Sequence, residues 1–86
     1  MDFKVGDYVE NKMQCAYLSG GRNWLVRNKV KQSLIDRWEH DAPEIGIKGT
    51  IVFVAPYYRA YGESITAYYF LSDEGKGYVI DYHNLT

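Results

Sequence analysis

The chain has one cysteine, two prolines and a net charge close to zero. The cysteine count and the charge limit the classes of protein to which it can belong. Cys15 stands alone among 86 residues, so no disulfide can form within the chain. A small domain without a disulfide depends on packing alone, which fits a reducing compartment. The net charge of −1 gives no overall attraction to nucleic acid.

Long apolar runs are also missing. No run approaches the ~18 residues of a membrane-spanning helix. The opening segment, MDFKVGDYVE, lacks the apolar core of a signal peptide. We therefore expect a cytoplasmic protein with no membrane partner.

No catalytic or metal-binding pattern stands out. Cys15 with His40 or His83 is a nucleophile and base by residue type only, and a lone cysteine in an apolar stretch is usually inert packing. The histidines and aspartates match no ligand spacing, and GGRNW lacks the lysine and hydroxyl residue of a phosphate loop. The sequence predicts a protein that is not an enzyme and needs no cofactor or metal.

Tyrosine, by contrast, is abundant. The chain has nine tyrosines, and five of them fall within the segment APYYRAYGESITAYYF at 55–70. We predict a surface loop over YYRAYGES, where Tyr57, Tyr58 and Tyr61 cannot all be buried. Tyr68 and Tyr69 follow in a strand and should point to opposite faces, one in the core and one exposed.

The remaining pattern is mainly β, with one helical stretch. Strands are predicted over FKVGDYVENKM, GIKGTIVFVA, ITAYYFLS and YVIDYHNLT, and a hairpin around Gly20-Gly21. Apolar residues recur every four positions from Val26 to Trp38, which predicts an amphipathic helix over about 29–41. Asn28 is its expected N-cap, and Pro43 ends it.

The order of these segments resembles that of small SH3-like barrels of the KOW and Tudor type. The likeness is carried by the opening Lys4-Val5-Gly6-Asp7, the step GIKGTIVFV and the closing YYFLSDEGKGYVIDYHNL. It implies one domain over 1–86, a five-stranded barrel with an inserted hairpin and helix at about 15–44. The chain also resembles tyrosine-rich single-barrel proteins encoded by phages, which would act in the host cytoplasm.

Two sets of residues are candidate contacts. The first set joins the tyrosines to an arginine, because Tyr and Arg are enriched at binding hot spots: Tyr57, Tyr58, Arg59, Tyr61 and Tyr68. It favours a protein-binding module, such as a phage-encoded modulator or inhibitor of a host protein. A lid packed over the barrel end is the structural alternative for the loop tyrosines.

The second set is a basic stretch around an aromatic residue, which suits phosphates and a stacked base: Arg22, Trp24, Arg27, Lys29 and Lys31. It favours nucleic-acid binding as the alternative function, or a second protein contact. An extended peptide and a methylated lysine are further candidate ligands for the tyrosines. A second copy of the chain is a further candidate partner.

Overall fold

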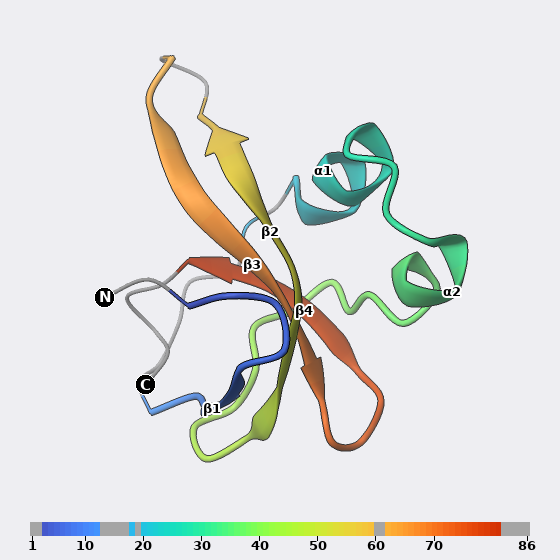
Figure 1. Cartoon of the computed structure of the whole chain (residues 1–86), viewed down its shortest axis with the longest axis vertical. Helices are drawn as coiled ribbons and strands as arrows, with labels where there is room; N and C mark the ends of the chain where they lie inside the picture. The colour runs from blue at the N-terminus through green and yellow to red at the C-terminus, as the bar shows by residue number, and fades with distance from the viewer. Residues whose placement is uncertain (1–2, 13–17, 19, 60–61, 82–86) are drawn as a thin grey trace.

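The computed structural model describes residues 3–12, 18, 20–59 and 62–81, and its main feature is an antiparallel sheet. Its strands follow the order β1-β2-β3-β4 and are β1 (Tyr8–Glu10), β2 (Lys48–Tyr58), β3 (Ser64–Ser72) and β4 (Gly77–Asp81). Two short helices, α1 (Gly21–Arg27) and α2 (Gln32–Ile35), lie side by side over one face of the sheet (Figure 1). The mainly β prediction is confirmed, whereas the described residues form four strands rather than five.

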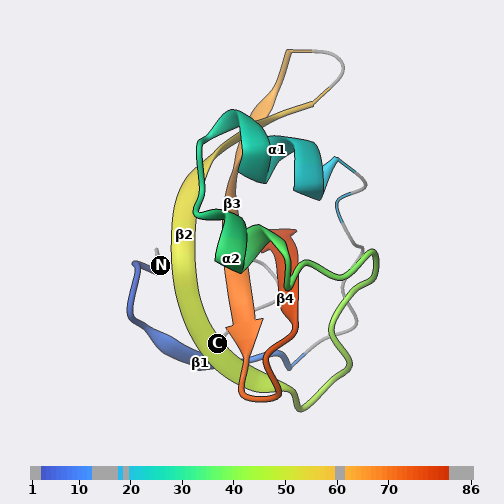
Figure 2. The same cartoon turned by 90° about the vertical axis from the view of Figure 1, so that its right-hand side faces the viewer.

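A β-bulge in β2 decides which side chains face the helices. Ile51 pairs with Phe70 and Phe53 pairs with Tyr69, so Val52 is an extra residue in the ladder. Without the bulge, Ile51, Phe53 and Tyr57 would share one face of the sheet. The bulge instead leaves Ile51 on the far face and turns Phe53 and Tyr57 towards the helices. Figure 2 shows β2 as a strongly curved strand beneath α1 and α2.

Both faces of the sheet are buried, which the alternation in β3 did not predict. Tyr68 lies in the β1-side cluster with Val9, Ile51 and Phe70. Tyr69 lies on the other face, in the helix-side cluster with Leu25 and Val79. Both tyrosine side chains are 0% exposed. The prediction that they point to opposite faces is correct, but the prediction that one is exposed is wrong, because the helical segment covers the second face.

The Gly20-Gly21 pair begins a helix instead of turning a hairpin. Gly20 is the N-cap of α1, with φ of −89°, and Gly21 is its first residue. A Cβ at Gly21 would lie 2.9 Å from Cβ of Val79, so glycine lets α1 approach β4 closely. Trp24 and Leu25, one turn later, bury the same face of α1. The hairpin prediction is therefore wrong here: close packing, and not a tight turn, requires the glycine.

The predicted helix over 29–41 is wrong in extent. A Schellman motif ends α1 at the point where the predicted helix should begin. The Val30 amide donates to the Leu25 carbonyl and the Lys29 amide to the Val26 carbonyl, and Lys29 has a φ of +57°. Asn28 is thus the C-cap of α1 and not an N-cap. Only Gln32–Ile35 is helical beyond this break, and Val26, expected on the buried face, is 49% exposed.

Among the described residues, no helix combines the length and the apolar character needed to cross a membrane.

Candidate functional site

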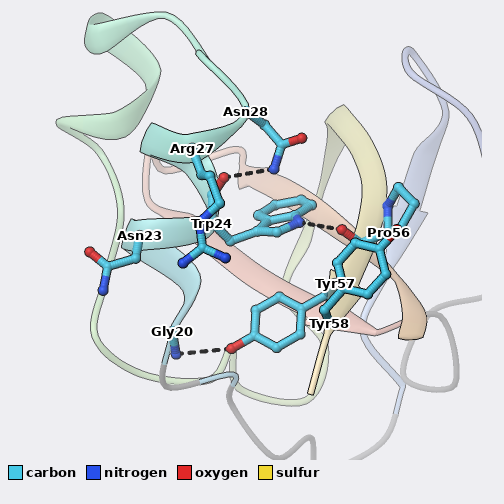
Figure 3. A pocket seen from close by; sticks show the side chains of 8 residues that line it. All are labelled: Gly20, Asn23, Trp24, Arg27, Asn28, Pro56, Tyr57 and Tyr58. Atoms are coloured by element: carbon cyan, nitrogen blue, oxygen red, sulfur yellow. Dashed lines mark hydrogen bonds between the residues drawn. The ribbon is translucent and has the colours of Figure 1, made fainter. Parts of the chain in front are cut away.

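The two sets of predicted contact residues meet at one place in the fold. The C-terminal half of α1 brings Trp24 and Arg27 against the end of β2, which carries Tyr57 and Tyr58. Between them lies a hollow with a volume of about 350 Å³, here called the α1–β2 hollow (Figure 3). Its lining consists of Gly20, Asn23, Trp24, Arg27, Asn28, Pro56, Tyr57 and Tyr58.

Trp24 forms the floor of this hollow and is fixed by hydrogen bonding. Its indole Nε1–H donates to the Pro56 carbonyl oxygen at 2.8 Å. β1 pairs only with residues 48–50 of β2. The part of β2 around Pro56 therefore has β3 as its one partner among the described strands. A proline is tolerated at such an edge because it has no N–H to leave unpaired. The tryptophan therefore satisfies a carbonyl group that no described strand reaches.

Tyr57 forms a second fixed wall. Its hydroxyl accepts a hydrogen bond from the Gly20 amide at 3.1 Å, which ties β2 to the start of α1. Its ring lies 6.3 Å from that of Trp24, whose other neighbour, Phe53, is 5.3 Å away in an edge-to-face arrangement. A Cβ at Gly20 would lie 2.5 Å from the Tyr57 hydroxyl, so glycine is needed for this contact. Two helix–strand hydrogen bonds and two ring contacts thus hold the aromatic walls in place.

The rim differs from the floor because its side chains are open to solvent. Tyr58 is 69% exposed, and Asn23 and Arg27 are exposed on α1. The Asn28 amide group donates to the Trp24 carbonyl at 2.8 Å, which also helps to end the helix. Among the described residues, Arg27 is the only charged one that lines the α1–β2 hollow. None of the described lining residues carries a carboxylate, an imidazole or a thiol; they offer hydrogen-bonding groups, aromatic rings and one guanidinium.

The structure brings some of the predicted residues together and leaves others apart. The α1–β2 hollow is lined by four of them, Trp24, Arg27, Tyr57 and Tyr58. Tyr57 and Tyr58 belong to strand β2, so the prediction that both lie in a loop is wrong. Tyr61 lies outside the described residues, and Arg59 follows β2 as an exposed residue whose amide donates to the Glu63 carbonyl.

Two predicted contacts are buried. Tyr68 has no exposed surface, so it supports the core and does not form part of an outer face. Trp24 is 5% exposed and its N–H is already bonded, so it offers no open ring for a stacked base. The basic side chains behave differently: all four are exposed, on α1 and on the segment that joins it to α2 (Arg22, Arg27, Lys29, Lys31).

Sequence reasoning missed four lining residues, namely Gly20, Asn23, Asn28 and Pro56. Pro56 gave the clearest available signal, because a proline within an extended run marks an edge strand whose carbonyl groups need other partners. Asn28 was recognised as a cap, but it was assigned to the wrong end of a helix.

A second hollow, of about 220 Å³, lies away from the first and has the opposite charge. We call it the acidic hollow; it is lined by Glu39, Asp41, Ala42, Glu44, Ile47, Glu74, Lys76 and Tyr78. Burial raises the pKa of Tyr78, and the negative charges of Glu39 and Glu74 raise it further. Within the described part of the chain, no group of three or more side chains has the arrangement of a metal site.

Comparison with known proteins adds no relative: no family model, curated protein or solved structure matches this chain. The physical properties of the two hollows therefore carry the functional argument.

Proposed function

We propose that this protein is a non-enzymatic protein-binding module and that the α1–β2 hollow is its contact site. One observation carries the proposal: Tyr58, which is 69% exposed, lines the same hollow as Arg27 and the buried, hydrogen-bonded Trp24. Exposed large aromatic side chains lose apolar hydration when a partner covers them, and Tyr, Trp and Arg dominate measured hot spots.

The fixed walls support the same conclusion. Binding costs free energy when side chains must be ordered, at about 0.5–1.5 kcal/mol for each immobilised side chain. Trp24 and Tyr57 are already held by their bonds to Pro56 and Gly20, so a partner would order only the rim. A pre-formed wall with a mobile rim is therefore suited to reversible recognition.

For the fold we propose the SH3-like arrangement. The sequential antiparallel order, the bulged and curved β2 and the turn at Gly6 support it. Small size and high tyrosine content support a phage-encoded modulator of a host protein as the concrete form of this function. The helical segment is the part that differs from a plain barrel, because it covers one sheet face and forms half of the hollow.

The test compares two exposed tyrosines. The full chain is used to capture partners, and the affinity of the recovered partner is measured by calorimetry for wild type, Tyr58→Ala and Tyr8→Ala. Tyr8 is the matched control, because it is 59% exposed and lies in β1, outside the hollow. We expect Tyr58→Ala to weaken binding by at least about fivefold, the effect of a residue worth about 1 kcal/mol or more, and Tyr8→Ala to leave it unchanged. Equal effects of the two substitutions would contradict the assignment.

Nucleic-acid binding is the second candidate, because Arg22, Arg27, Lys29 and Lys31 are all exposed. It predicts a gel shift with single-stranded DNA that weakens steeply as salt rises, since phosphate contacts release counterions. A shift that is absent or insensitive to salt would remove this candidate. The burial of Trp24 argues against it, because the predicted stacking ring is covered.

A further inference from the structure

The two hollows differ in net charge, although Lys76 lies among the carboxylates of the acidic hollow. Of the described residues that line the α1–β2 hollow, only Arg27 is charged, and it extends from an exposed position on α1. Four carboxylates gather instead around the acidic hollow. Among the described residues, no carboxylate lines the α1–β2 hollow beside the guanidinium, so an approaching negative group meets a positive charge with no acidic neighbour in that lining.

The guanidinium also has a particular geometry. Arginine offers five N–H donors in a planar fork, which matches the two oxygens of one carboxylate. Such bidentate pairs are stronger than bonds between neutral groups, and more so beside apolar walls than in open water. Arg27 stands at the edge of aromatic walls formed by Trp24, Tyr57 and Tyr58.

The size and lining of the hollow limit what else enters. Its 350 Å³ lies at the small end of ligand pockets, which run from about 300 to 1,000 Å³. This volume suits one large side chain better than an extended cofactor. The rings of Trp24 and Tyr57 are inclined at 50° to each other, and an entering ring can pack edge-to-face against the half-buried Tyr57.

We propose that the α1–β2 hollow recognises an acidic–aromatic segment of a partner protein. One aromatic side chain packs against the accessible surfaces of Tyr57 and Tyr58, above the buried Trp24, and a neighbouring Asp or Glu carboxylate pairs with Arg27. This inference rests on the proposed protein-binding function and adds the chemistry of the partner. A lysine side chain, methylated or not, is disfavoured because it would place a second cation beside Arg27.

The experiment uses labelled short peptides and the full chain at physiological salt, with fluorescence anisotropy as the readout. The central phenylalanine is constant, and its flanking residues are acidic, basic or neutral. A fourth peptide keeps the acidic flanks and replaces Phe by Ala, and a labelled oligothymidine of similar length completes the set. We expect the acidic Phe peptide to bind at least about tenfold more tightly than the neutral one, since a hydrogen bond to a charged group contributes that much or more.

Arginine variants locate the contact. Arg27→Gln should abolish the preference for acidic flanks, and Arg27→Lys should restore part of it, because lysine keeps the charge but not the fork. Arg37→Gln is the matched control: Arg37 is also exposed, and its guanidinium reaches the Gly75 carbonyl, away from the hollow. Circular dichroism confirms that each variant is folded before affinity is compared.

The outcomes separate the two proposals. Equal binding of acidic and neutral peptides, lost in Tyr58→Ala, would overturn the charge preference and leave the protein-binding function standing. A captured partner that needs Tyr58, with no binding of any peptide, would have the same meaning. Oligothymidine binding that Arg22→Gln and Arg27→Gln reduce equally, with no peptide binding, would overturn both proposals in favour of nucleic acid.

Discussion

The two faces of the sheet are closed by different means, and the hollows at their margins have different linings. The β1-side cluster is covered by β1 and by the segment before β2, which the buried Asn11 amide holds through the Pro43 and Glu44 carbonyls at 3.0 Å. The helix-side cluster is covered by α1, α2 and Trp38. Each face has a hollow at its margin, but carboxylates line the first and tyrosine, tryptophan and arginine line the second.

A hollow beside a buried cluster is not by itself a candidate binding site. Both hollows lie beside a buried cluster, but the aromatic residue among the described lining of the acidic hollow, Tyr78, is itself buried and has little hydration to lose on contact. The α1–β2 hollow exists because the bulge in β2 turns Tyr57 to the helix side and because α1 ends beside the strand. The same features that cover the second face therefore also build the candidate site.

The largest expected effect on stability comes from replacing Trp24, the buried α1 side chain in the helix-side cluster. Trp24→Ala should lower the free energy of unfolding by about 3–5 kcal/mol, the usual cost of deleting a buried aromatic ring. Phe70→Ala on the β1 side should cost about the same. Denaturant unfolding measures both. Hydrogen exchange should show that Trp24→Ala exposes the amides of α1 before those of β3, whereas simultaneous exposure would mean that the two faces unfold as one unit.

The next effect concerns a hydroxyl beneath α2. The Tyr69 hydroxyl donates to the Leu34 carbonyl, and burial raises the pKa of Tyr69 from 10.0 to about 12. Tyr69→Phe should cost about 1–3 kcal/mol at neutral pH, because the carbonyl loses its partner. Tyr68→Phe is the control on the other face: the Tyr68 hydroxyl accepts a longer bond, of 3.4 Å, from the Phe3 amide, so its removal should cost less.

The same shift sets a pH dependence. A tyrosine whose pKa is raised on folding stabilises the fold fully below pH 10.0, and this contribution is lost as pH rises towards 12. Wild-type stability should therefore fall between these values, and Tyr69→Phe should fall less over the same interval. An identical fall in both proteins, followed by denaturant unfolding at each pH, would assign the loss to other groups.

Much of the sheet was predictable, because the strands carry the period-two pattern and their turns carry glycine. The Gly6 turn, with φ of +97°, and the β3–β4 pairing are where the sequence places them. The helical segment was not predictable in the same way. Its boundary is a lysine in the left-handed conformation, where glycine is usual, and the packing of Val30 against the helix-side cluster favours it.

The site was predictable in composition but not in arrangement. Tyr58 and Arg27 were both candidates, yet nothing in the sequence indicated that residues so far apart line one hollow. Tyr57 reaches the hollow because of the bulge at Val52, which changes the face of the sheet that Tyr57 occupies. A bulge leaves no residue signature in a run of β-branched and aromatic residues such as Ile51–Val54.

A smaller effect tests the link between α1 and β2. Gly20→Ala would push a methyl group against the Tyr57 hydroxyl, and Tyr57→Phe removes the same hydrogen bond without a clash. Each should cost about 0.5–1.5 kcal/mol, the net value of one hydrogen bond. The double variant should cost less than the sum, because both changes act on one contact. Full additivity in denaturant unfolding would show that the two residues act independently.

The smallest effect separates a binding face from a lid. Tyr58→Ala should change the free energy of unfolding by no more than about 0.5 kcal/mol, as is usual for exposed positions. A thermal melt beside that of Tyr8→Ala measures it. A loss of several kcal/mol would instead assign Tyr58 to a lid that stabilises the end of the sheet.

Nuclear magnetic resonance of the ¹⁵N-labelled full chain, titrated with the captured partner, shows directly whether the partner binds at the α1–β2 hollow. The two tryptophan indole signals serve as paired reporters, because Trp24 lines the α1–β2 hollow and Trp38 packs against His40 instead. The account predicts that the Trp24 indole and the Gly20 and Arg27 amides shift while the Trp38 indole stays in place. Shifts confined to β1 or to the acidic hollow, with the Trp24 indole unmoved, would contradict it.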